Sequence, residues 1–157
     1  MKKIILSKNK CALVDDGDYK VLSKHKWTAK ESGGNIFYAV RRNPTNGKHF
    51  YMHKVIMGNP SGFEVDHISG DSLDNRKSNL RVCSHKQNLR NQKLSSANTS
   101  GYRGVYLRKD TRKWEAGIKV NQKRIVLGSF DNILDAARAY NNAAIKHFGE
   151  FARLNLT

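Results

Sequence analysis

The chain has 157 residues, and its 29 Lys and Arg against 13 Asp and Glu give a formal net charge of +16 at pH 7. This length accommodates one ordinary domain or two small ones. No apolar run approaches the roughly 18 residues that a membrane helix needs, and the N-terminal apolar patch is too short for a secretory signal. We therefore expect a cytoplasmic protein without a membrane partner. The two cysteines form no CxxC pair, which argues against a zinc knuckle, and the positive charge favours a polyanion as partner.

Residues 1–58 are expected to be rich in β-strands. Two strand-like segments, 36–42 and 48–55, flank the dipeptide Asn46-Gly47. Asn-Gly is a strong signal for a tight turn, because both residues tolerate a positive φ. The sequence therefore predicts a β-hairpin here.

Residues 59–93 are expected to contain two short strands, 62–67 and 80–83, joined by a polar loop and followed by a helix. Ser84 and Gln87 have the spacing of a capping box, in which each side chain bonds to the backbone of the other residue. The helix should therefore begin immediately after Ser84.

Residues 94–100 are small, polar and uncharged, which predicts a linker between a first domain, 1–93, and a second domain, 101–157. The second domain shows three strand-like segments and then a helix with a 3.6-residue apolar period. Its charge is uneven: residues 101–128 hold 8 basic and 2 acidic residues, whereas residues 129–157 hold 3 of each. The positive charge is therefore expected on the strands of this domain.

Side chains suited to catalysis are densest in the central segment, at Asp66, His67, Asn75, Asn79 and Asn88. Cleavage of a phosphodiester needs a base that deprotonates water and a cation that offsets charge on the phosphate. Histidine suits the base, and carboxylate and amide oxygens suit a hard cation such as Mg²⁺. Asp66 and His67 are adjacent and would point to opposite faces of a regular strand, so we expect the strand to bend there.

The segment VDHISGDSLDNRKSNLRVCSHKQN, within residues 53–92, resembles the HNH nuclease motif, a ββα-metal finger. The resemblance implies that His67 is the general base and that Asp66 binds a single divalent ion, Mg²⁺ or alternatively Mn²⁺. It also implies that Asn79 holds the loop between the strands so that His67 is correctly oriented. The last motif position is often a metal-binding His, but here it is Asn88, as in the phage and intron-encoded branch, and Asn88 would be the second ligand.

Three further residues near this motif have competing interpretations. His85 is the alternative to Asn88 as a metal ligand, although His85 lies beside the helix cap. Asn75 is expected to close a turn rather than to bind metal. His53 is expected to be structural rather than to touch phosphate.

Residues 100–156 carry the markers YRGV, WEAGI, LGSF, an alanine-rich helix and a closing LN. Together these markers resemble the Apetala or ethylene-response-factor type of DNA-binding domain, which implies a three-stranded antiparallel sheet backed by one helix and lying in the major groove. The family's DNA-contacting positions match Arg103, Arg108, Lys119 and Arg124. Tyr106, Gly117 and Val126 replace the plant Arg, Glu and Trp at three contacting positions, so we expect a different sequence preference.

A second run of positive charge lies between the two motifs. Residues 76–93 hold six basic residues and no acid, namely Arg76, Lys77, Arg81, Lys86, Arg90 and Lys93. Such a run can lie along the phosphate backbone and position the duplex beside the catalytic residues. For Lys86 and Lys93 taken singly, a solvated helix face is the alternative.

The expected fold is α+β, with a β-rich N-terminal region, a ββα-metal finger and then a three-stranded antiparallel sheet backed by one helix. The expected function is hydrolysis of double-stranded DNA by a homing-type nuclease of phage or mobile-element origin. It would act in a bacterial host as a monomer without an obligate protein partner. A sequence-specific DNA-binding regulator with an inactive nuclease finger is the alternative. An RNA-binding protein is disfavoured because no RNP-like aromatic strand is present.

Overall fold

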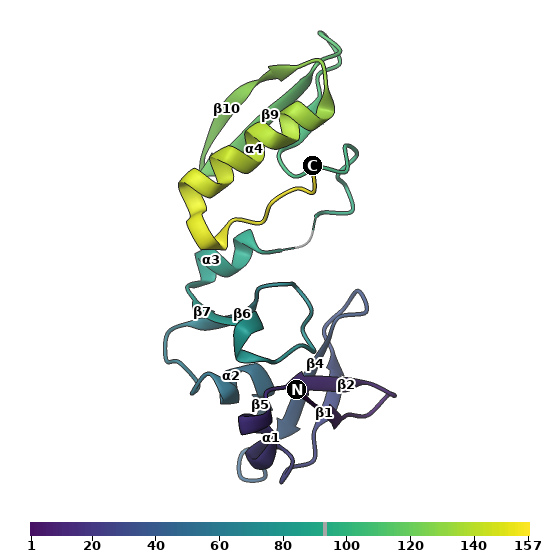
Figure 1. Cartoon of the computed structure of the whole chain (residues 1–157), viewed down its shortest axis with the longest axis vertical. Coiled ribbons are helices and arrows are strands. Elements are labelled where there is room, and N and C mark those ends of the chain that lie inside the picture. Colours follow the sequence, from purple (N-terminus) through teal and green to yellow (C-terminus); the bar gives the residue numbers. More distant parts are fainter. Residues whose placement is uncertain (93) are drawn as a thin grey trace. The chain divides into compact units, whose positions relative to one another are not determined.

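The computed structural model describes residues 1–92 and 94–157, which divide into two compact units, Met1–Asn88 and Leu89–Thr157 (Figure 1). Lys93 of the basic run lies outside the described residues. In the described part, small antiparallel sheets are combined with four α-helices, which confirms a mixed α and β fold. None of these helices is long and apolar enough to cross a membrane.

The first unit begins with two small antiparallel sheets. Their strands and the helix between them are β1 (Lys2–Ile5), β2 (Cys11–Val14), α1 (Asp16–Leu22), β3 (Thr28–Glu31), β4 (Phe37–Arg42) and β5 (His49–Tyr51). β1 pairs with β2, and the second sheet has the order β3-β4-β5. The predicted hairpin turn is present, with Gly47 at φ 69° and the Lys48 amide donating to Asn46 Oδ1 over 3.0 Å.

The prediction of a single strand over 48–55 is wrong, because β5 ends at Tyr51 and a helix, α2 (Met52–Ile56), follows. Met52 is fully buried, and Val55 and Ile56 pack against the same core. On a strand, Val55 would point to the face opposite Met52 and Ile56, whereas residues three and four positions apart share one side of a helix, so a helix lets all three pack against one core. The buried core residues of this part are Ile4, Leu6, Ala12, Val14, Leu22, Trp27, Ala29, Ala39 and Met52.

The central segment contains an antiparallel pair of strands and a short helix. Its elements are β6 (Glu64–His67), the one-turn 3₁₀ helix η1 (Lys77–Asn79), β7 (Leu80–Cys83) and α3 (His85–Arg90). The Ser84 amide donates to Gln87 Oε1 over 2.8 Å, and the Gln87 amide donates to Ser84 Oγ over 3.3 Å. The capping box is therefore formed, and α3 begins where it predicts.

The second unit has one antiparallel sheet of order β10-β9-β8, and α4 covers one face of it (Figure 1). The elements are β8 (Val105–Leu107), β9 (Trp114–Val120), β10 (Lys123–Phe130), α4 (Ile133–Phe148) and the 3₁₀ turn η2 (Gly149–Phe151). Asn132 caps α4 by accepting from the Leu134 amide over 2.8 Å. Alanines of α4 pack against Val105, Ala116 and Ile118 of the sheet. α4 therefore buries that face of the sheet.

Candidate active site

Asp66 and His67 are the last two residues of β6, and both side chains are buried. They pair in regular antiparallel register with Arg81 and Leu80 of β7. Because side chains alternate along a regular strand, Asp66 lies on the face of β6 that also carries Glu64, and His67 lies on the other face.

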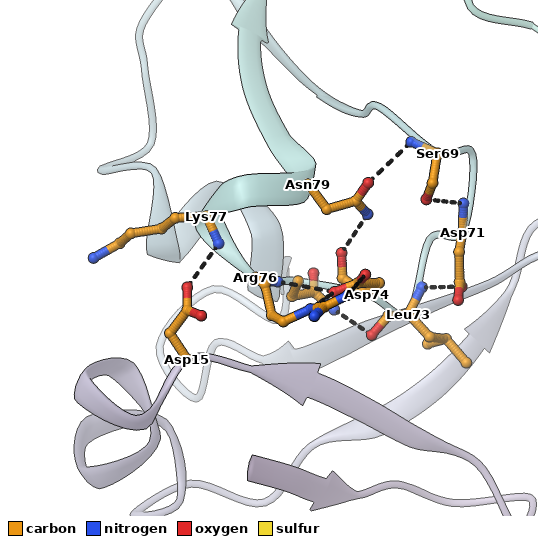
Figure 2. A network of polar contacts seen from close by, with 9 residues as sticks. Asp15, Ser69, Asp71, Leu73, Asp74, Arg76, Lys77 and Asn79 are labelled. Atoms are coloured by element: carbon orange, nitrogen blue, oxygen red, sulfur yellow. Dashed lines mark hydrogen bonds and ion pairs between the residues drawn. The ribbon is translucent and has the colours of Figure 1, made fainter. Parts of the chain in front are cut away.

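The loop between β6 and β7 is closed by hydrogen bonds that centre on Asn79 (Figure 2). Its Oδ1 accepts from the Ser69 amide over 2.9 Å, and its Nδ2 donates to the Asp74 carbonyl over 2.8 Å. The Ile68 amide also donates to the Asn79 carbonyl over 2.8 Å. These bonds join the residues after His67 to the start of β7. The bend that was expected at the Asp-His dipeptide therefore follows it, beginning at Ile68.

Buried polar side chains surround the His67 ring. Its Nε2 lies 3.4 Å from Oδ1 of Asn75, a fully buried residue whose Nδ2 donates to the Leu73 carbonyl over 3.1 Å. The Asn75 amide therefore turns its oxygen toward the ring, which favours the tautomer with the proton on Nε2 and the lone pair on Nδ1. Burial lowers the pKa of His67, against the opposing effects of Asn75 and Asp66, so the ring is neutral at pH 7.

A second buried imidazole, that of His53 in α2, packs edge-on against His67. The ring centroids are 4.9 Å apart and the ring planes meet at 75°. Tyr38 and Tyr51 lie beside it, each with a ring centroid 5.6 Å from that of His53. Burial, and then the neighbouring His67, lower the pKa of His53 to about 3. The predicted base is thus packed against another ring that carries no charge at neutral pH.

The Asp66 carboxylate is bound by Arg81 across the strand pair. Nε and Nη2 of Arg81 lie 3.0 and 2.8 Å from Oδ2 of Asp66. The two side chains are only 11% and 8% exposed. Arg81, predicted to contact DNA, therefore neutralises the predicted metal ligand in this structure. Removing either partner would take away the buried counter-charge of the other.

The predicted second ligand, Asn88, is bound by Glu64, an acid for which the sequence predicted no role. Its Nδ2 donates to Oε2 of Glu64 over 2.5 Å. Nδ1 of His85 lies 2.8 Å from Oε1 of the same carboxylate. These two hydrogen bonds hold the pKa of Glu64 below its ordinary value. Since Glu64 shares a face of β6 with Asp66, its contact brings Asn88 to the face on which Asp66 lies.

Two basic residues predicted to follow the phosphate backbone are paired with acids of the first unit. Nε and Nη2 of Arg76 donate to the two oxygens of Asp74 over 2.8 and 2.6 Å and lower the pKa of that carboxyl (Figure 2). Nζ of Lys77 lies 3.2 Å from Oδ1 of Asp18. Arg90 belongs to the second unit, where its guanidinium stacks on an aromatic ring. The acid-free run of the sequence is thus partly balanced by acids from other segments.

In the second unit, two predicted DNA-contacting residues, Arg108 and Arg124, lie on either side of one buried acid, Glu115. Glu115 is 5% exposed, and its carboxylate lies 3.0 Å from Arg108 Nη1 and 3.3 Å from Arg124 Nη2. Arg124 also lies over the ring of Tyr106, with its guanidinium carbon 4.6 Å from the ring centroid. Lys119 is exposed and pairs with Arg124 across β9 and β10. This part of the sheet is therefore positive and carries Tyr106 where the plant family has Arg.

The fourth predicted contact, Arg103, takes part in a clasp that closes the second unit. Its guanidinium donates to the Gln92 carbonyl, and its amide donates to Asn155 Oδ1 over 2.7 Å. Asn155 and Asn141 of α4 exchange two further hydrogen bonds, of 2.8 and 2.9 Å. The YRGV and LN markers of the sequence thus meet in space.

The segment that contains Asp66, His67, Asn79 and Asn88 is also the part of the chain that matches a known family model. The profile of the HNH endonuclease family matches residues 52–90. An uncharacterised HNH endonuclease of Acanthamoeba polyphaga mimivirus is 31% identical over 145 residues, which is 92% of this chain and 74% of the viral protein. This chain belongs to the HNH endonuclease family. Protein 3.8 of Escherichia phage T7 is 33% identical over 94 residues, or 60% of this HNH endonuclease and 77% of the phage protein.

The C-terminal part of this HNH endonuclease has a separate similarity. APETALA2-like protein 2 of Oryza sativa subsp. indica is 46% identical over 57 residues. The match covers 36% of this chain but only 13% of the plant protein. The similarity is therefore confined to one small segment of the plant protein.

HNH nucleases generally use a divalent metal ion, and the donors present here suit a hard cation. The predicted ligands, Asp66 and Asn88, offer a carboxylate and an amide oxygen, whereas Zn²⁺ is usually bound by nitrogen and sulfur. Among residues 1–92 and 94–157, no group of three His, Cys, Asp or Glu side chains is placed to hold a metal. With two protein oxygens, an ion would keep several waters, as Mg²⁺ does.

Two residues that shape this site, Glu64 and Asn75, were not given these contacts from the sequence. For Glu64 a signal was present, because its position two residues before Asp66 places both carboxylates on one strand face. Asn75 was expected to close a turn, and its contact with His67 arises only when the loop folds back.

Proposed function

We propose that this HNH endonuclease hydrolyses DNA phosphodiester bonds with His67 as its general base. The observation that carries the proposal is the state of His67: a buried, neutral imidazole at the end of β6, with Nε2 toward Asn75. A base with a lowered pKa is unprotonated at neutral pH and can accept a proton from water. Family membership supports the same reaction.

In this proposal each residue has a separate part. Nδ1 of His67 accepts a proton from the water that attacks phosphorus, and the products carry 5′-phosphate and 3′-hydroxyl ends. Asn79 closes the loop after His67 and so fixes the direction of the ring. Asp66 and Asn88 hold one divalent ion, Mg²⁺ or Mn²⁺, which when bound supplies positive charge for the phosphate and the leaving oxygen.

We further propose that the second unit is a DNA-binding module that brings the nuclease to its target. The similarity to APETALA2-like protein 2 and the positive sheet face support this role. Sheets can enter the major groove of a duplex. The proposed contacts of this module are Arg103, Arg108, Lys119 and Arg124. Those of the central segment are Arg76, Lys77, Arg81 and Arg90.

The proposed arrangement is a nuclease domain, 1–93, joined by a linker, 94–100, to a DNA-binding domain, 101–157. A tether of this kind raises the effective concentration of DNA at the nuclease, so the nuclease needs little affinity of its own. The viral relatives support a phage or viral source. We propose a homing-type role on double-stranded DNA, performed by a monomer without an obligate protein partner.

Replacement of His67 tests the proposal. We expect His67→Ala to slow Mg²⁺-dependent nicking of supercoiled plasmid by about 100-fold or more, the usual contribution of a general base. DNA affinity, measured by gel shift, should change little, since phosphate contacts made elsewhere set it. His25→Ala is the matched control, because His25 is exposed and outside the site, and it should nick like the wild type. Unchanged nicking by His67→Ala would show that His67 is not the base.

The ion pair between Asp66 and Arg81 favours one alternative function. With this carboxylate already neutralised, the chain could be a sequence-specific DNA-binding regulator with an inactive nuclease finger. Wild-type protein that binds DNA but nicks it with neither Mg²⁺ nor Mn²⁺ would support the regulator.

A further inference from the structure

The hydrogen bond between Asn88 and Glu64 restricts how the Asn88 amide can point. The two Glu64 oxygens lie 2.8 Å from Nδ1 of His85 and 2.5 Å from the Asn88 side chain, and a carboxylate in such contacts accepts hydrogen bonds. The Asn88 atom that lies 2.5 Å from Oε2 must therefore be the amide nitrogen. The amide oxygen of Asn88 is consequently turned away from Glu64.

The backbone around Asn88 is also fixed. Its amide donates to the Ser84 carbonyl over 3.0 Å, in the first turn of α3, which the capping box of Ser84 and Gln87 stabilises. On β6, Glu64 and Asp66 are two residues apart, which separates them by roughly 7 Å along one strand face. Glu64 thus contacts Asn88, one predicted ligand, and shares a strand face with Asp66, the other.

We infer that Glu64 is a positioning residue for the cation site, holding the Asn88 amide by its nitrogen so that the amide oxygen faces the ion. The inference rests on the proposed function, because it takes Asp66 and Asn88 as the ligands. Hydrogen bonds from the surroundings orient metal ligands and raise the basicity of their donor atoms. Glu64 acts through Asn88 and contacts neither the ion nor the DNA.

The first test compares Glu64→Gln with Glu64→Ala in the whole chain. Gln keeps an oxygen that can accept from the Asn88 amide, whereas Ala removes the acceptor. Two quantities are measured: Mn²⁺ binding without DNA, from the loss of the EPR signal of the hydrated ion, and the Mn²⁺ concentration for half-maximal nicking. Glu64→Ala should weaken both by about tenfold or more, and Glu64→Gln by less than about threefold, while the KM for DNA stays unchanged.

Glu31→Ala is the matched control for loss of a negative charge. Glu31 is a half-exposed acid of β3 whose partner is Lys8. This variant should bind Mn²⁺ like the wild type, and thermal unfolding confirms that each variant is folded.

The second test is a double-mutant cycle between Glu64→Ala and Asn88→Ala. If Glu64 acts through Asn88, adding Glu64→Ala to Asn88→Ala should not weaken Mn²⁺ binding further. Losses that add would overturn the inference, because Glu64 would then act on the ion directly.

The outcomes separate this inference from the proposed function. Glu64→Ala with wild-type Mn²⁺ affinity would overturn the inference alone, and so would Glu64→Gln that binds as weakly as Glu64→Ala. Wild-type protein that binds Mn²⁺ but never nicks DNA would count against the proposed function alone. Wild-type protein that fails to bind Mn²⁺ would overturn both.

Discussion

At the scale of single residues, His53 couples the stability of the first unit to pH. Its ring is buried, and burial together with His67 lowers its pKa to about 3. In the unfolded chain the ring takes up a proton near an ordinary pKa of about 6.5. Between these two values the unfolded state binds more protons than the folded state, so stability must fall as the pH falls. His67, whose pKa is also lowered, acts in the same direction.

Between pH 7 and pH 5, this effect of His53 should remove about 2 kcal/mol of the free energy of unfolding. His53→Phe keeps a ring against His67 but does not titrate, so its loss should be smaller than that of the wild type by about 2 kcal/mol. Urea denaturation at both pH values measures the difference. His25→Ala should lose as much as the wild type. A His53→Phe protein with unaltered pH dependence would mean that His53 takes up its proton in the folded state.

At the scale of elements, the YRGV segment depends on a glycine. Gly104 has φ 71°, and a Cβ built there would lie 2.2 Å from the Tyr140 ring and 2.5 Å from the Gly117 carbonyl oxygen. The helix α4 and the strand β9 thus approach the backbone at this point more closely than any side chain permits. Gly101 has a similar φ of 76° but nothing within 4 Å of its Cβ position.

Gly104→Ala should therefore destabilise the second unit by about 3 kcal/mol, through overpacking added to backbone strain. Gly101→Ala carries only the strain and should cost about 1 kcal/mol. Thermal unfolding followed by the NMR signals of Trp114, in the second unit, and of Trp27, in the first, measures each unit separately. Equal effects of the two substitutions on Trp114 would contradict the close approach at Gly104.

Elements with strong local signals could be predicted from the sequence. The hairpin at Asn46-Gly47 and the start of α3 both follow from residues within a few positions of one another. α2 could not, because its five residues make less than two turns and show no period. Its helical form depends on the core that Met52 enters.

Strand register explains why the sequence could propose residues for the site but not their contacts. Asp66, His67 and Asn88 were proposed from residue type, spacing and the motif, whereas Arg81 meets Asp66 only once β6 and β7 have paired. Likewise, Glu115 lies between two arginines only because β8, β9 and β10 align.

At the scale of the whole molecule, the net charge of +16 does not show which basic residues already pair with acids of the same chain. Many basic residues proposed to contact phosphate already have acidic partners: Arg76, Lys77, Arg81, Arg108 and Arg124. To bind DNA, each of these residues must give up its ion pair with an acid of the same chain and form one with a phosphate. Lys119 differs, because it takes part in no ion pair within the part of the chain that the structure describes.

Lys119→Gln should therefore weaken DNA binding and make it less sensitive to salt. Each phosphate neutralised contributes about 0.9 to the slope of log affinity against log salt, so the slope should decrease by about that amount. Arg138→Gln is the control, since Arg138 lies on α4 and pairs with Asp135 at 3.1 Å. Fluorescence anisotropy over a range of salt concentrations gives both slopes. An unchanged slope for Lys119→Gln would place the DNA elsewhere.

The hydrogen bonds between Arg103 and Asn155 affect when the two units can fold during synthesis on the ribosome. The first unit is built from residues up to Asn88 and can fold as soon as these have emerged, whereas the second waits for Asn155. At synthesis rates of about 5–20 residues per second, the 67 residues that follow Asn88 up to Asn155 take roughly 3 to 13 s. For that interval each nascent chain carries a folded nuclease segment whose proposed DNA-binding module does not yet exist.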